Sequence, residues 1–237
     1  MSVEFIVFFA ILSFLTSLLT SIFSLGGGLI MLVALAQSFS PATLIPLHGS
    51  IQLANNFSRT LVYLEFFQWK LIKNIVISTM FGAVIGIYLF GTLPENLLVM
   101  VIAATILFLT WAPLDNLILS VMKNDWFCGF ISGFAGIFVG ANGPLVTAYL
   151  RTKNLSPELL VANHGAIMIF QHGIKIILFV SFFNFKILDY FSFILILALT
   201  GYAGAILGRR LISKVPFKSF NIILKVFLTL LAFSLFF

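Results

Sequence analysis

Residues 21–50 read SIFSLGGGLIMLVALAQSFSPATLIPLHGS, an apolar stretch interrupted by a glycine run, a Ser-Pro pair and a His-Gly pair. A run of glycines continues a helix poorly, so we predict a helix break at Gly26-Gly27-Gly28 and a short new helix after it. A related pattern returns at residues 141–166, ANGPLVTAYLRTKNLSPELLVANHGA, where a proline stands at the start of the new helix. Two matched breaks in apolar sequence indicate a duplicated helical unit.

The two halves of the chain match at a constant offset of 116 residues, which becomes 122 after a six-residue insertion. Chance similarity between apolar segments does not supply several polar pairs in one register. The matches are Gly27 with Gly143, Ser40-Pro41 with Ser156-Pro157, His48-Gly49 with His164-Gly165, Arg59 with Lys175, Gly82 with Gly204, Gly86 with Gly208, and Pro94 with Pro216. We predict one transmembrane domain over 1–237, with repeat one at 1–114, a linker at 115–125 and repeat two at 126–237.

Composition places the chain in the bilayer. Hydrophobic residues make up 61% of it and charged residues 8%, whereas soluble domains are about one quarter charged. No alternating ten-residue segments indicate a β-barrel, so we expect an all-α polytopic membrane protein with about eight to ten hydrophobic helical segments. The net charge of +6 comes from cations spread between these segments, which argues against nucleic-acid binding. A cleavable signal peptide is not expected, since residues 1–9 lack a basic region.

Charges, prolines and polar turns divide the chain into helices. Each half is predicted to contain a broken or re-entrant helix pair followed by three spanning helices. The expected helices are Val3–Ser24, Leu29–Ala36, Ala42–Phe66, Trp69–Phe90, Glu95–Trp111, Phe127–Val139, a short piece ending at Leu150, Pro157–Phe182, Ile187–Leu211 and Phe217–Phe237.

The loop cations predict the relation between the halves. With three full spans after each helix pair, one side of the membrane collects nine cations and the other side only Lys186. Fusing each pair into a single span gives a weaker bias, so the positive-inside rule favours inverted repeats with the cationic side in the cytoplasm. The nine cations are Lys70, Lys73, Lys123, Arg151, Lys153, Arg209, Arg210, Lys214 and Lys218.

The two breaks are candidate binding sites. Each frees backbone N–H groups at the start of a helix inside the membrane, where the helix dipole attracts anions. Interrupted segments at matching positions of two halves also indicate the central site of a transporter. The alternative is a kink or a tight helix contact without a ligand. The candidate residues are Gly26, Gly27, Gly28, Asn142, Gly143 and Pro144.

A polar stripe on each long helix is the second candidate. Its spacing of i, i+4, i+7 and i+11 in the first half places the side chains on one helix face, with Asn56 beside it. Since polar groups in hydrocarbon are costly, these faces must point inward or to water. They form either a substrate path or a hydrogen-bonded seam with snorkelling cations. The residues are His48, Gln52, Asn55, Asn56 and Arg59, and His164, Gln171, His172 and Lys175.

Carboxylates occur only at predicted segment ends, near the terminus or in the linker, and Cys128 is the single cysteine. The sequence therefore offers neither an acidic cation pathway nor a metal cluster, and we expect no cofactor and no metal site. Paired carboxylates, a metal-binding His/Glu cluster and a Ser–His arrangement are also missing, which argues against an intramembrane enzyme. Buried cations and histidines fit an anion, and the histidines could supply proton coupling.

The triple-glycine break, the His-Gly pair with Asn55-Asn56, and the reduced break near Gly143-Pro144 resemble the sulfite exporter TauE/SafE family over nearly the whole chain. This toluene-sulfonate uptake permease superfamily comprises small duplicated bacterial transporters of sulfite, sulfonates and other sulfur-containing anions. The resemblance implies a multi-pass protein of the bacterial inner membrane. Asn142 and Pro144 replace glycines of the second break, a departure from the family pattern.

These features favour secondary active transport of a small sulfur-containing anion by alternating access, linked to protons. A passive anion channel of the same fold, a membrane subunit without its own transport activity and an intramembrane enzyme are the alternatives. The expected partners are the anion and the lipid bilayer, and assembly into a homo-oligomer stays open.

Overall fold

The computed structural model describes residues 1–24, 26–111, 124–140, 142–212 and 229. Within them the chain forms helices and short 3-10 turns and no strand, which confirms the all-helical prediction. The elements are α1 (Val3–Phe23), α2 (Gly27–Ala36), α3 (Pro41–Val62), η1 (Leu64–Phe66), α4 (Trp69–Phe90), α5 (Glu95–Trp111), α7 (Asp125–Val139), α8 (Gly143–Arg151), α9 (Pro157–Phe183), η2 (Ile187–Tyr190) and α10 (Phe191–Leu211).

Most helix boundaries follow the sequence signals, and α2 and α8 begin at the two predicted breaks. The prediction of one helix up to Phe66 was wrong at its end, because α3 stops at Val62 and a 3-10 turn follows. The prediction of one α-helix from Ile187 was likewise wrong at its start, because a 3-10 turn covers Ile187–Tyr190 and α10 begins at Phe191. The Tyr63 hydroxyl donates to the Ser21 carbonyl of α1 (3.0 Å), a tertiary contact that helps hold this turn. The predicted helix 217–237 and most of the predicted linker lie outside the described residues.

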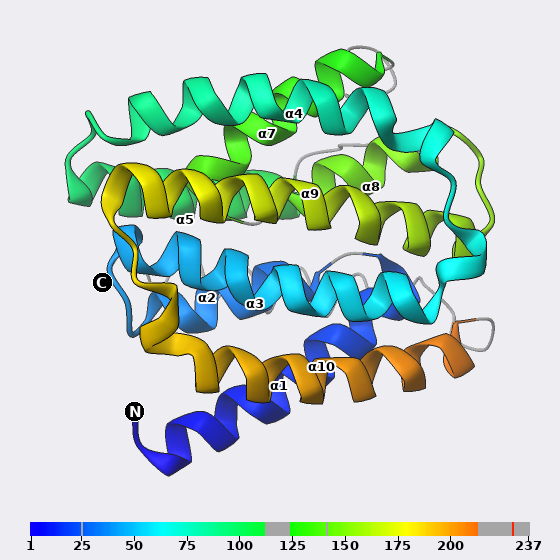
Figure 1. Cartoon of the computed structure of the whole chain (residues 1–237), viewed down its shortest axis with the longest axis horizontal. Helices are drawn as coiled ribbons and strands as arrows, with labels where there is room; N and C mark the ends of the chain where they lie inside the picture. Colours follow the sequence, from blue (N-terminus) through cyan, green and yellow to red (C-terminus); the bar gives the residue numbers. More distant parts are fainter. Residues whose placement is uncertain (25, 112–123, 141, 213–228, 230–237) are drawn as a thin grey trace.

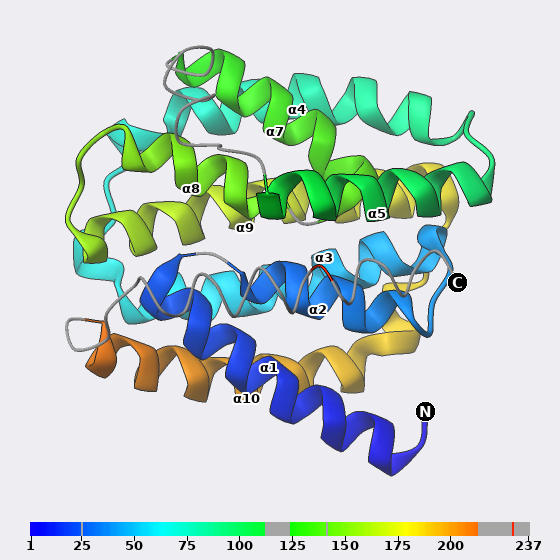
Figure 2. The same cartoon turned by 180° about the vertical axis from the view of Figure 1, so that it is seen from behind.

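The helices stack in four tiers (Figures 1 and 2). α4 and α7 form one outer tier, and α1 and α10 form the other. Between them, α9 lies with α8 and α5 in one tier, and α3 lies with α2 in the next. Each outer tier thus pairs a helix from one half of the sequence with a helix from the other half. α3 and α9, the helices with the polar stripes, pack against each other at the centre.

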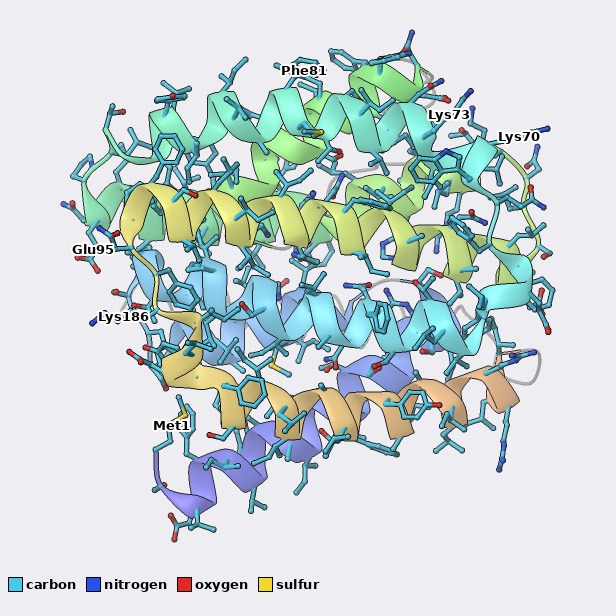
Figure 3. The ribbon with its side chains drawn as sticks, viewed as in Figure 1. Met1, Lys70, Lys73, Phe81, Glu95 and Lys186 are labelled. Carbon is cyan, nitrogen blue, oxygen red and sulfur yellow. The ribbon has the colours of Figure 1, made fainter. Side chains whose placement is uncertain are left out.

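The chain path shows that the two broken helix pairs open toward opposite ends of the molecule. Figure 3 places Met1, Glu95 and Lys186 at one end and Lys70 and Lys73 at the other. α1 starts and α2 finishes at the Lys186 end, whereas α7 starts and α8 finishes at the Lys70 end. α3, α5 and α10 run from the Lys186 end toward the Lys70 end, and α4 and α9 run the opposite way. In each pair the chain turns back at the break, so it enters and leaves the pair at the same end of the molecule.

Glycines allow the outer helices to approach closely. A Cβ on Gly82 of α4 would overlap the Phe130 carbonyl of α7, and a Cβ on Gly204 of α10 would overlap the Phe14 carbonyl of α1. Gly86 and Gly208 lie one turn further along the same two contacts. Both Gly-x-x-x-Gly patches are therefore packing contacts, the arrangement that small residues permit between membrane helices.

The outer surface suits a bilayer. Within the described part of the chain, four helical segments are long and apolar enough to cross a membrane: Val3–Phe23, Trp69–Phe90, Pro157–Phe183 and Ile187–Leu211. Large apolar side chains point outward from the outer tiers, for example Phe81 on α4, which is 61% exposed (Figure 3). Such a surface would be unfavourable in water and is stable against lipid chains. The polar side chains of α3 and α9 lie inside this apolar shell.

Candidate functional site

The two polar stripes meet at the centre of the molecule. Every side chain of both stripes is buried, with at most 8% of its surface exposed, and α3 packs directly on α9. The helices run in opposite directions, so Arg59 of α3 lies near His164 of α9, while Lys175 of α9 lies against Gly49 of α3. The prediction that these faces point inward is confirmed, since lipid would leave their polar groups without partners.

A small cavity lies where α1, α2, α3, α8 and α9 converge. Its volume is about 30 Å³, room for about two water molecules. Both helix breaks and both stripes contribute to its wall. The lining residues are Thr20, Ser24, Gly26, Gly28, Leu29, His48, Gln52, Asn56, Arg59, Gly143, Pro144, His164, Met168 and His172.

The short helices α2 and α8 both begin at this cavity. Their N-caps, Gly26 and Asn142, give no side-chain cap to the first turn. Gly26 has a φ of 92°, a left-handed value that favours glycine. The first N–H groups of a helix have no partner within it, and the dipole adds positive potential there. α8 offers fewer donors than α2, because Pro144 has no N–H and the Leu145 N–H donates to the Asn142 carbonyl.

Arg59 provides a buried positive charge in the wall of the cavity. Only 2% of the residue is exposed, and it forms no ion pair with any residue that the structure describes. Its guanidinium donates to the Asn56 side-chain oxygen and to His164 Nδ1 (3.4 Å), while its Nε has no hydrogen-bond partner. A buried charge without a counter-charge is unfavourable, so this environment favours an anion in the cavity.

In each His-Gly pair, the histidine contacts the start of a short helix and the glycine contacts the cation of the other long helix. His48 Nε2 donates to the Gly28 carbonyl (2.9 Å), and His164 Nε2 donates to the Gly143 carbonyl (3.3 Å), so each histidine fixes the start of a short helix. In this arrangement His164 is neutral, since its Nδ1 accepts from Arg59. The missing Cβ of Gly49 leaves room for Lys175, whose Cδ would lie 3.3 Å from it.

Lys175 lies beside the cavity and does not line it. Its Nζ donates to the Gly140 carbonyl at the end of α7 (2.9 Å) and to Nδ1 of His172 (3.3 Å). His172 does line the cavity, and its ring centroid is 6.0 Å from that of His48. The imidazole of His172 therefore lies between the Lys175 amine and the cavity.

Four other predicted site residues also face away from the cavity. A Cβ on Gly27 would overlap the Thr16 carbonyl, so this glycine lets α2 approach α1. Asn55 donates to Ser13 Oγ (3.1 Å). The Asn142 amide donates to the Ser132 carbonyl and to Gln171, and the Gln171 amide donates to Thr79 and Ser132. These contacts hold the helices around the cavity together.

The sequence reasoning missed four lining residues, Thr20, Ser24, Leu29 and Met168. Thr20 and Ser24 belong to a run of hydroxyl side chains on α1, whose four-residue spacing would have identified a buried polar face. Leu29 and Met168 carry no comparable signal, because an apolar residue in an apolar helix looks the same at any position. No cluster of three potential metal ligands occurs among the described residues.

Comparison with known proteins identifies the family of the chain. The model of a protein family described as sulfite exporter TauE/SafE matches residues 9–235. The chain belongs to this family. No curated protein and no solved structure matches the chain. As a member of the TauE/SafE family, the chain is a multi-pass membrane protein of a transporter family.

Proposed function

We propose that this protein is a secondary active transporter of a small sulfur-containing anion, such as sulfite or a small organosulfonate, and that the central cavity binds the anion. The observation that carries the proposal is Arg59, a buried cation in the cavity wall that forms no ion pair within the described residues. An oxyanion would supply the missing negative charge and accept charge-assisted hydrogen bonds from the guanidinium.

The remaining donors of the cavity suit a compact oxyanion. The free N–H groups at the start of α2 face it together with the side chain of Gln52. The cavity volume of about 30 Å³ favours a small ion, so a larger organosulfonate would require the cavity to widen. Among the residues that the structure describes, no carboxylate lines the cavity to repel an anion. Gly26, Gly28, Arg59 and His164 are the proposed central contacts.

Alternating access follows from the proposal of inverted repeats, one over 1–114 and one over 126–237. Support comes from the two re-entrant pairs, which open toward opposite ends, and from the outer tiers, which exchange helices between the halves. Rocking of one helix group against the other would then expose the cavity first at one end and then at the other. We place the protein in the bacterial inner membrane, with the Lys70 end in the cytoplasm.

A binding screen and a flux assay test the function. Purified protein is heated with sulfite, sulfate, thiosulfate, sulfoacetate, taurine and simple carboxylates, and we expect a sulfur oxyanion or sulfonate to raise the unfolding temperature most. Flux of the best anion into proteoliposomes should increase with an imposed pH gradient. Flux at channel rates that ignores the gradient would replace the transporter with the passive channel. No binding of any sulfur anion would refute the proposed substrate class.

A further inference from the structure

Lys175 is a buried amine with an unusual set of neighbours. Only 2% of it is exposed, and its Nζ contacts two hydrogen-bond acceptors, the Gly140 carbonyl and His172 Nδ1. Neither acceptor carries a negative charge. No ion pair among the described residues includes Lys175. Its charge is therefore balanced by dipoles alone, at the carbonyl end of α7.

The charged and titratable groups around Lys175 come from few elements. α9 itself contributes His164 and His172, and α3 contributes His48 and Arg59. α7 presents only a carbonyl oxygen at this place. The other ionisable groups of the packed helices lie toward the ends of the molecule, at Glu4 on α1, Lys70 and Lys73 on α4, Asp125 on α7, Tyr149 and Arg151 on α8, and Glu158 on α9.

The matching cation of the first half is held differently. Lys175 donates to the carbonyl of Gly140, and the residue that matches Gly140 at the offset of 116 is Ser24. An equivalent hydrogen bond from Arg59 would therefore go to the Ser24 carbonyl. Instead, Thr147 Oγ1 donates to the Ser24 carbonyl (2.6 Å). Arg59 is thereby left at the cavity, while Lys175 is held behind it. Arginine stays charged in proteins, whereas a buried lysine can release its proton.

We propose that Lys175 is the proton-binding residue of the transport cycle and exchanges its proton with the cavity through His172. This inference rests on the proposed anion transport. An anion in the cavity stabilises a positive charge on the nearby amine, and a protonated amine strengthens anion binding, so the two ligands bind cooperatively. Arg59 binds the anion whether Lys175 is protonated or neutral. The protonation of Lys175 couples the transport of the anion to the transport of a proton.

The proton step needs Lys175, His172 and a proton acceptor in the cavity, which is water or the bound anion. The Lys175 ammonium transfers a proton to His172 Nδ1, which it already contacts at 3.3 Å, and the imidazole releases its other ring proton, on Nε2, to the cavity. The amine is then neutral and the imidazole is neutral with its proton on Nδ1. Return of a proton from the cavity reverses both transfers, so charge and atoms balance. Histidine relays protons in this way through its two ring nitrogens.

Sulfite flux in proteoliposomes tests the assignment with Lys175→Arg, which keeps a positive donor but cannot release its proton. The matched control is Lys186→Arg on the exposed loop after α9. Sulfite itself takes up a proton near neutral pH, so all variants are compared in identical buffers after subtraction of protein-free liposomes. We expect Lys175→Arg to lose the sulfite accumulation that a pH gradient drives while gradient-independent sulfite exchange stays measurable, whereas the Lys186→Arg control keeps both.

Each result decides the question. Gradient-driven accumulation by Lys175→Arg equal to that of the control overturns the role of Lys175. Sulfite exchange by the unmodified protein without any effect of the gradient overturns the proton site and leaves the transporter proposal standing. No sulfite flux by the unmodified protein overturns the proposed function itself, at least for this anion. Lys175→Gln guards against misfolding: if both variants lose exchange together with accumulation, Lys175 serves anion binding or folding and the proton assignment fails.

Discussion

Arg59 and Lys175 occupy matching positions of the predicted repeat, yet their surroundings differ. Arg59 lines the cavity and has an unpartnered Nε, whereas Lys175 is held by the end of α7 and by His172. The packing around the two residues is nevertheless alike, because each lies against the glycine of the opposite His-Gly pair. The two matched positions therefore share their packing against a glycine and differ in their polar contacts. The predictions below separate the shared scaffold from the diverged contacts.

The largest effect is expected at the cavity. Replacing Arg59→Gln should weaken sulfur-anion binding about 10- to 100-fold, because a hydrogen bond to a charged group contributes about 1.5–3 kcal/mol. Anion affinity is measured from the thermal shift as a function of anion concentration. The control is Arg209→Gln, whose guanidinium bonds the exposed carboxylate of Glu65. Equal losses in the two variants would make Arg59 a structural charge.

The outer helix contacts should respond equally in both halves. Gly82→Ala and Gly204→Ala each place a methyl group against a backbone carbonyl of the facing helix, so each should destabilise the protein by about 1–3 kcal/mol. Unfolding in detergent measures the loss. Gly173→Ala is the control, since no atom of the described residues lies within 4 Å of a Cβ at this position. A large loss in one half alone would show that the two scaffolds are not equivalent.

The amides beneath the cavity should respond unequally. Gln171 uses both ends of its amide, while the Oδ1 atom of Asn55, its match in the repeat, has no partner. Removing Gln171 with the apolar Gln171→Met leaves several buried groups unpaired, and we expect a loss of about 1–2 kcal/mol. Asn55→Leu should cost less than about 1 kcal/mol, since one hydrogen bond is lost. Similar losses, read from unfolding curves, would contradict the difference between the halves.

The smallest effects are expected at the surface ion pairs. Glu65 pairs with Arg209 (2.6 Å) and Asp125 pairs with Lys153 (3.2 Å), and all four side chains are at least 26% exposed. Exposed pairs contribute about 0–1 kcal/mol, so Glu65→Gln and Lys153→Gln should leave stability and anion flux nearly unchanged. High salt should abolish any remaining difference in stability between these variants and the unmodified protein. A strong loss of flux in either variant would instead reveal a gating contact at the Lys70 end.

Much of the architecture was predictable because bilayers allow few solutions. Long apolar segments must be helical, and glycine or proline breaks must end them, so most boundaries fell within a few residues. The start of α10 and the end of α3 were exceptions, and at the end of α3 Tyr63 leaves the helix and bonds to α1. Local sequence carries no signal for that contact. The polar stripes were predicted to face inward for the same solvation reason, and their burial confirms it.

The lining of the cavity was less predictable. Gly27 and Gly28 are neighbours in one glycine run, yet Gly27 faces α1 and Gly28 faces the cavity. Lys175 and Arg59 likewise match in sequence and differ in position. Which side chain reaches a cavity depends on helix rotation and on the neighbouring helices, and these follow from packing across the whole molecule.

The sequence by itself determined that the chain lies in a membrane, where its helices break, which faces are polar and that its buried ionisable groups are cations and histidines. Those properties follow from solvation and backbone conformation, which act within one segment. The tertiary structure decided that both short helices begin at one cavity, that Arg59 lines it and that Lys175 stands behind His172. Contacts between residues more than a hundred positions apart produce this arrangement, and no local pattern encodes them.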